Sequence, residues 1–92
     1  MSEIVRYRMS FTGRVQGVGF RYTATNIANK LRLVGFVKNE YDGSVTVEVQ
    51  GQEEVIDMFL QSINSGRFIN VESIEKERIP VEEDDRSFIE QY

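Results

Sequence analysis

Residues 13–21 have the sequence GRVQGVGFR, and this stretch separates a strand-like segment from a helix-like segment. Before it, apolar and polar residues alternate as in a strand, and after it apolar residues recur at helical spacing. The stretch is therefore a glycine-rich strand-to-helix connection with an arginine at the start of the helix. Backbone N–H groups, a positive helix end and a guanidinium group would meet there, which suits a small anion such as phosphate. The alternative is an ordinary tight connection.

Hydrophobic periodicity on both sides of this stretch predicts the elements of the first half. Residues 5–12 alternate as a half-buried strand does. Residues 20–31 repeat apolar side chains at helical spacing, and Gly35 is expected at the joint to a short strand over 34–39. A turn at residues 41–43 then begins a hairpin into a second alternating strand, which Gly51 closes.

The second half predicts another helix and another strand. Glu53 and Glu54 suit a helix start because acidic side chains complement the helix dipole, and Gly66 is expected to cap the end of that helix. Residues 71–79 predict a strand whose interrupted alternation indicates a bulge or an edge position. The acidic residues 82–85 are expected in an exposed loop, and residues 87–92 add an optional short strand.

The element order is strand, helix, strand, strand, helix, strand, within one expected domain over residues 1–92. Both helices bury their apolar stripes only if they lie on the same face of the sheet. The sequence therefore predicts an α+β fold, the ferredoxin-like βαββαβ sandwich, with an antiparallel sheet and an optional fifth strand. Met9 and Met58 are expected in its core.

The residue types that are absent exclude several kinds of chemistry. The chain of 92 residues has no cysteine and no histidine. This excludes disulfides, thiol nucleophiles, imidazole bases and the usual zinc ligands. The lack of cysteine fits a reducing compartment, no signal-peptide pattern begins the chain, and no apolar run approaches the roughly 20 residues of a membrane span. We therefore expect a cytoplasmic protein without a membrane partner.

Charge is unevenly distributed along the chain. The net charge is −4, but residues 1–38 carry +6 and residues 39–92 carry −10. The basic first half favours a small anionic substrate, whereas the overall acidity argues against nucleic acid as a partner. RNA binding through the sheet stays as an alternative, although the chain has no recognisable RNP1 signature. The simplest explanation for most of these charges is that they are solvated.

Arg21 and Asn39 are the candidate functional side chains. A cation at the start of a helix opposes the dipole, so Arg21 has no stabilising role there unless an anion binds beside it. Asn39 is also explained as a turn residue before the hairpin. Tyr22 and Tyr41 flank these positions in sequence, where packing is a simpler role than catalysis.

Two motifs resemble the signatures of the acylphosphatase family. The sequence GRVQGVGFR at 13–21 is similar to the first signature. The sequence GFVKN at 35–39, followed by DGSV at 42–45, is similar to the second, at the expected separation. Phe36 is a mild departure, because the family often has tryptophan there. The resemblance extends in less detail over nearly the whole chain.

This resemblance implies a fold, a reaction and a site. Members of the family have the ferredoxin-like fold and hydrolyse acyl phosphates to a carboxylate and inorganic phosphate, without a metal or other cofactor. By resemblance, Arg21 binds the phosphate and Asn39 orients the attacking water. The matching phosphate-binding loop comprises Val15, Gln16, Gly17, Val18, Gly19 and Phe20, together with Arg21.

A binding or accessory module is the alternative to an enzyme. Acylphosphatase-like domains also occur in larger maturation proteins that handle carbamoyl phosphate. Residues 1–92 include no such additional domain, which favours a stand-alone enzyme. Its expected partners are a small-molecule acyl phosphate and inorganic phosphate, and we expect a monomer.

Overall fold

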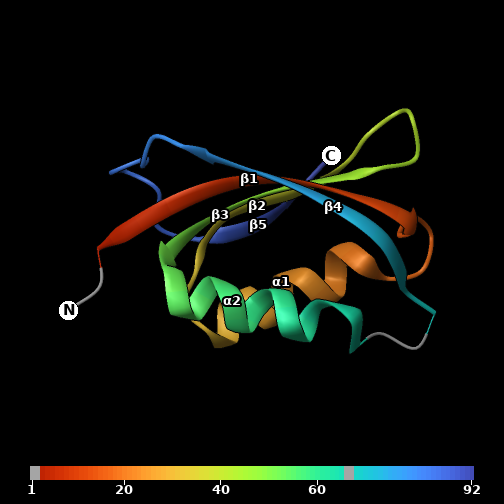
Figure 1. Cartoon of the computed structure of the whole chain (residues 1–92), viewed down its shortest axis with the longest axis horizontal. Coiled ribbons are helices and arrows are strands. Elements are labelled where there is room, and N and C mark those ends of the chain that lie inside the picture. The colour runs from red at the N-terminus through yellow and green to blue at the C-terminus, as the bar shows by residue number, and fades with distance from the viewer. Residues whose placement is uncertain (1–2, 66–67) are drawn as a thin grey trace.

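The computed structural model describes residues 3–65 and 68–92, and in it the chain forms a β-sheet covered by a layer of helices (Figure 1). The elements in chain order are β1 (Ile4–Arg14), α1 (Phe20–Lys30), β2 (Val34–Asn39), β3 (Val45–Gln52), α2 (Glu53–Ser62), the short 3₁₀ helix η1 (Ile63–Ser65), β4 (Asn70–Ile79) and β5 (Phe88–Gln91). Both α-helices cover the same face of the sheet. The strand order β4-β1-β3-β2-β5 confirms the ferredoxin-like arrangement and the optional fifth strand.

The sheet is mixed, because the four predicted strands pair antiparallel and the optional fifth strand, whose pairing the sequence left open, is parallel to its neighbour. β4, β1, β3 and β2 pair antiparallel, but β5 lies parallel to β2, with Gly35 beside Phe88 and Lys38 beside Gln91. The reason is where β4 ends. Its last residue lies at the end of the sheet where β2 begins, so a loop that stays at this end starts β5 in the same direction as β2.

Polar contacts hold the loop between β4 and β5 at that end of the sheet. The side chain of Gln50 accepts a hydrogen bond from the backbone N–H of Glu82 at 2.8 Å and donates one to its carbonyl at 3.1 Å. Arg6 donates to Asp85 at 3.0 Å and pairs with Glu48 at 3.1 Å, and its side chain is only 3% exposed. These contacts guide the chain to β5.

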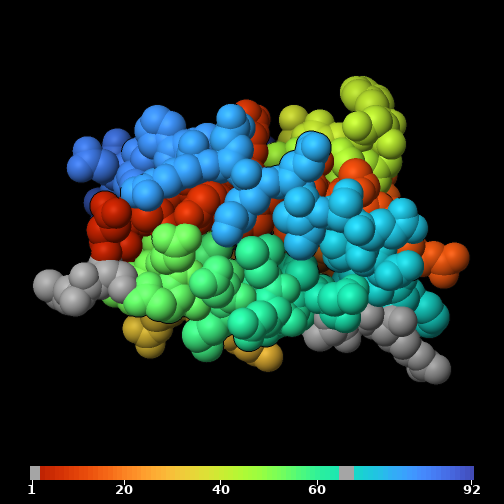
Figure 2. Space-filling model, in the orientation of Figure 1, coloured from red at the N-terminus to blue at the C-terminus, as the bar shows by residue number. Residues whose placement is uncertain are grey.

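The core lies between the sheet and the helices, and Figure 2 shows the two layers packed against each other along the molecule, with α2 in green below β4 in blue. Met9 and Phe11 on β1 are fully buried. The ring centroid of Phe11 lies 5.1 Å from that of Phe20, which anchors the start of α1 beside the end of β1. The prediction for Met58 is wrong, because it lies outside the apolar stripe of α2 and is 50% exposed, whereas the adjacent Phe59 is buried.

One predicted strand end and the expected place of one glycine differ from the structure, although β2 has its predicted bounds, and a third prediction lies outside the described residues. Gly51 does not close its strand, because β3 continues to Gln52 and passes directly into α2. Gly35 is not at a joint. It is the second residue of β2, at a φ of 136°, where a Cβ atom would overlap the carbonyl oxygen of Glu48 on β3. The expected helix cap at Gly66 lies outside the described residues.

Strand β4 has both features that its interrupted alternation indicates. It is an edge strand of the sheet. Thr12 pairs with Ser73 and Gly13 pairs with Val71, so Glu72 is an extra residue opposite β1, which is a bulge. The bulge lies at the end of β1, immediately before the connection to α1.

Candidate active site

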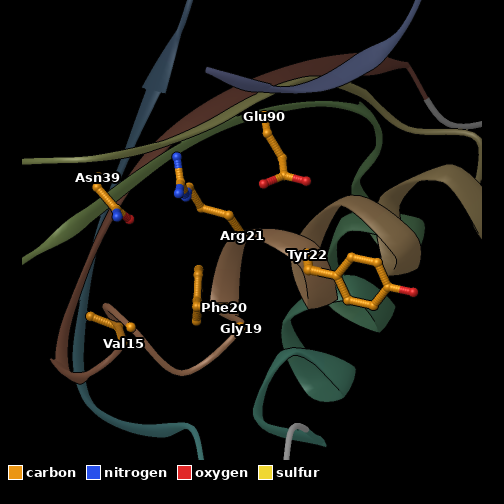
Figure 3. A pocket seen from close by; sticks show the side chains of 8 residues that line it. Val15, Gly19, Phe20, Arg21, Tyr22, Asn39 and Glu90 are labelled. Carbon is orange, nitrogen blue, oxygen red and sulfur yellow. The ribbon is translucent and has the colours of Figure 1, made fainter. Parts of the chain in front are cut away.

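A pocket of about 210 Å³ opens where β1 connects to α1. Its lining comes from the β1–α1 loop, the first turn of α1, the end of β2 and strand β5 (Figure 3). The lining residues are Val15, Gly17, Gly19, Phe20, Arg21, Tyr22, Asn39 and Glu90. The fold therefore brings Arg21 and Asn39, which come from separate elements, to one pocket.

The β1–α1 loop leads into a helix end that has no negative side chain. Gly17 and Gly19 have φ angles of 72° and 82°, a left-handed conformation that glycine adopts readily. Gly19 is the N-cap of α1, no side chain caps this end, and the first turn has no acidic residue. Thr23 donates the first intrahelical hydrogen bond, to the carbonyl of Gly19 at 2.9 Å. The N–H groups of residues 20–22 come before the first intrahelical bond and therefore have no acceptor within the helix. The positive end of the helix dipole faces the pocket at these groups.

Arg21 adds a positive charge at this end of the helix. Its guanidinium carbon lies 4.7 Å from the ring centroid of Tyr92, within the range of a cation–π contact. Within the ranges 3–65 and 68–92, no carboxylate lies within ion-pair distance of Arg21. Its charge is therefore available to an anion.

Asn39 is the last residue of β2, where its backbone pairs with Val45 on β3. The side-chain oxygen Oδ1 is buried and has no hydrogen-bond partner among the described residues. Leaving a buried acceptor without a donor is unfavourable by about 1–3 kcal/mol, and such groups are rare in folded proteins. This oxygen therefore suits a donor that enters the pocket.

Hydrogen bonds tie the turn after Asn39 to the β1–α1 loop. The Gln16 side chain donates to the carbonyls of Glu40 and Ser44 at 2.7 and 2.8 Å. Within the turn, Asp42 accepts from the Ser44 hydroxyl at 2.6 Å and from its backbone N–H at 2.9 Å. These donors, the hydroxyl foremost, lower the pKa of Asp42 below its ordinary value. Gln16 thus couples the two segments that carry the candidate side chains.

The predicted phosphate-binding residues fall into two groups. Val15, Gly17, Gly19, Phe20 and Arg21 line the pocket, whereas Gln16 and Val18 do not. The side chain of Gln16 bonds to the turn, and that of Val18 packs partly buried against the core, so only their backbone groups can face a ligand of the loop.

The flanking tyrosines lie outside the centre of the pocket. Tyr22 lines its rim with 68% of its surface exposed. Tyr41 is fully exposed on the turn and does not line the pocket.

Sequence reasoning missed Glu90 and the contact between Tyr92 and Arg21. Along β5, alternation puts Glu90 on the same side as the buried Phe88. An acidic residue at an inward position was the signal that could have identified it. The tyrosine contact has no such local signal, because it depends on where β5 lies.

The fold and the pocket together define a class of protein. It is a ferredoxin-like domain with a pocket at its first strand-to-helix connection, where Arg21 lies at the N-terminus of α1. In the described part of the chain, neither α-helix has the length and apolar run that a membrane crossing requires. No cluster of three or more histidine, cysteine, aspartate or glutamate side chains is positioned to hold a metal ion among those same residues.

Comparisons with known proteins identify the family. Residues 7–89 match the family model of acylphosphatase. An acylphosphatase of Clostridium acetobutylicum is 44% identical over 84 residues, which cover 90% of this chain and 92% of that protein. The crystal structure of acylphosphatase from Bacillus subtilis has a TM-score of 0.89 at 36% identity and covers 96% of this chain and 99% of that one. The chain belongs to the acylphosphatase family.

The same fold also matches part of a larger protein. The crystal structure of HypF from T. kodakarensis has a TM-score of 0.84 at 36% identity, and the match covers 96% of this chain but only 12% of that one.

Proposed function

We propose that this acylphosphatase hydrolyses acyl phosphates by direct attack of water on phosphorus. Loop 15–19, the first amides of α1 and Arg21 hold the phosphoryl group, and Asn39 orients the water. The observation that carries this proposal is the buried Oδ1 of Asn39, which has no partner among the described residues and lies in the same pocket as Arg21.

The phosphoryl group is the part of the substrate that the loop and Arg21 recognise. Backbone N–H groups at a helix N-terminus and the fork of a guanidinium group both donate to phosphate oxygens. In the transition state, negative charge is spread over the equatorial phosphoryl oxygens. Donors already held in place lower the barrier because they need no rearrangement when this charge develops.

Asn39 acts on the attacking water. Its Oδ1 accepts a hydrogen bond from the water and directs a lone pair of the water oxygen towards phosphorus. The bond between the water oxygen and phosphorus forms while the bond between phosphorus and the acyl oxygen breaks. The electron pair of the broken bond leaves with the carboxylate. The proton of the water passes to a phosphate oxygen. This route uses neither histidine nor cysteine, which the chain lacks.

We also propose that the reaction needs no metal or other cofactor. Arg21 and the helix amides supply the positive charge, and a carboxylate is a good enough leaving group to depart without a general acid.

The cysteine-free composition supports a cytoplasmic location. The small size of the chain supports a monomeric enzyme in which residues 1–92 act as a single domain.

Hydrolysis of benzoyl phosphate tests the reaction and its independence from metals. After exhaustive chelation we expect substrate loss well above the spontaneous rate. Activity that disappears on chelation and returns with a divalent cation would refute the cofactor-free mechanism.

The substitution Asn39→Ala tests the orientation of water. We expect kcat to fall about 100-fold or more, while inorganic phosphate inhibits as before because loop 15–19 and Arg21 are unchanged. Asn26→Ala, at an exposed position of α1 outside the pocket, is the matched control and should retain wild-type kcat. Undiminished kcat in Asn39→Ala would remove the role given to Asn39.

A further inference from the structure

Glu90 is the only acidic side chain among the described residues that line the pocket. It lies half-buried on β5, on the side of the buried Phe88, whereas Ile89 between them is 50% exposed on the opposite side. A carboxylate next to a bound phosphoryl group repels it, so phosphate binding does not account for this residue. Glu90 therefore needs another explanation.

The position of Glu90 relative to Asn39 supplies an explanation for this residue, and that explanation rests on the proposed function. In Figure 3, Asn39 lies on one side of Arg21, and Glu90 and Tyr22 lie on the other. The attacking and leaving oxygens of a phosphoryl transfer lie roughly in line with phosphorus. If water attacks from the side of Asn39, the acyl group leaves on the opposite side, towards Glu90 and the rim at Tyr22.

The carboxylate of Glu90 forms no ion pair with a described residue. In the parts of the chain that the structure describes, no lysine or arginine lies within ion-pair distance of its carboxylate. Arg21 is in the same pocket, but its guanidinium group contacts the ring of Tyr92. No cation is therefore paired with the carboxylate of Glu90, and an acyl group beside it meets its negative charge.

We propose that Glu90 determines the specificity of this enzyme for the acyl group. It favours acyl phosphates whose acyl group is neutral or cationic, and it disfavours those whose acyl group carries a second negative charge. Like charges a few ångströms apart at a partly solvated site repel strongly enough to change kcat/KM by about tenfold, and salt weakens this repulsion.

Two substrates of equal size test the proposal, because they differ in one charge. They are 3-carbamoylbenzoyl phosphate, which is neutral at the acyl group, and 3-carboxybenzoyl phosphate, which is anionic there. After correction for spontaneous hydrolysis, we expect the wild-type kcat/KM to be about tenfold higher for the carbamoyl substrate at low ionic strength, and this ratio to fall as salt is added. Glu90→Gln should bring the ratio to within about twofold of one, and Glu90→Lys should reverse it.

A matched control separates the local effect from that of net charge. Glu83→Gln removes the same charge from an exposed position in the loop between β4 and β5. The neighbours of Glu83, Glu82 and Asp85, contact Gln50 and Arg6 at the end of the sheet opposite the pocket. This variant should keep the wild-type ratio.

Three results would be decisive against the proposal or its basis. A folded Glu90→Gln enzyme that hydrolyses both substrates with the wild-type ratio would overturn the role of Glu90 and leave the reaction intact. A wild-type ratio that does not change with salt would overturn it without any variant. A wild-type protein that fails to hydrolyse benzoyl phosphate would instead refute the proposed function.

Discussion

Two single residues in the pocket are each unfavourable in the protein by itself. Arg21 places a cation at the positive end of α1, which costs about 0.3–1 kcal/mol at such positions. Asn39 buries an acceptor that has no donor among the described residues. In the proposed mechanism, an anion beside Arg21 and a water at Asn39 would offset both costs. Local instability at these two positions therefore accords with a binding site better than with packing.

The residue-scale prediction concerns the shape of the cation at position 21. Arg21→Lys keeps the charge but loses the planar fork that donates to two phosphate oxygens at once. We expect kcat/KM for benzoyl phosphate to fall about 100-fold or more and inhibition by inorganic phosphate to weaken, with an unchanged melting temperature. Arg86→Lys, exposed in the loop between β4 and β5, is the control. A loss smaller than about threefold would contradict bidentate binding.

At the scale of elements, α1 ends in a turn that is unusual for its sequence. Leu33 donates to the carbonyl of Ala28 at 2.9 Å, and Arg32 donates to that of Asn29 at 3.2 Å. This is the pair of bonds of a Schellman motif, in which glycine normally occupies the left-handed position. Here Arg32 occupies it, with a φ of 59°. The helix end is thus determined by tertiary packing, with the buried Leu33 leading into β2.

This geometry predicts that Arg32→Gly stabilises the protein. Glycine removes the strain of a side chain in the left-handed conformation, which costs roughly 1–2 kcal/mol, although it also makes the unfolded chain more flexible. We expect a net gain of about 0.5–1 kcal/mol in the free energy of unfolding, measured in urea, and a higher melting temperature. Arg32→Ala, which keeps the strain, should show no such gain. A Gly variant that melts below the Ala variant would contradict this explanation.

At the scale of the whole molecule, Arg6 connects parts of the chain that are far apart in sequence. Its buried guanidinium group bonds to Glu48 and Gln50 on β3 and to Asp85 in the loop that leads to β5. That loop carries β5 to the edge beside β2, where Glu90 reaches the pocket. The position of one side of the candidate active site thus depends on contacts at the opposite end of the sheet.

Arg6→Ala is therefore expected to destabilise the fold. It leaves Glu48, whose side chain is 14% exposed, without its best partner and breaks the contact to the loop. We expect a loss of about 2–3 kcal/mol in the free energy of unfolding, measured in urea. Arg8→Ala is the control, because Arg8 is 57% exposed and lies 3.5 Å from the same carboxylate, so its loss should be below about 1 kcal/mol. Equal losses in the two variants would contradict the role of burial.

Local patterns explain which predictions from the sequence are confirmed. Alternation in β1 and helical spacing in α1 depend on neighbouring residues, so the element order and the shared face of the helices could be predicted. The predictions that are wrong concern boundaries and packing. Gly35 was expected at a joint because glycine often ends an element, but here it allows β2 to approach the backbone of Glu48. Met58 was expected in the core from its residue type, although it lies outside the apolar stripe.

The sequence by itself determined the element order, the glycine-rich connection at 13–21 and the candidate pair Arg21 and Asn39, because each depends on local pattern or on motif resemblance. Only the tertiary structure decided that β5 runs parallel to β2, that Gln16 ties the loop to the hairpin turn, and that Glu90 lines the pocket. These features depend on pairings between distant segments. Such pairings are set by loop closure and side-chain packing, which no local window of sequence contains.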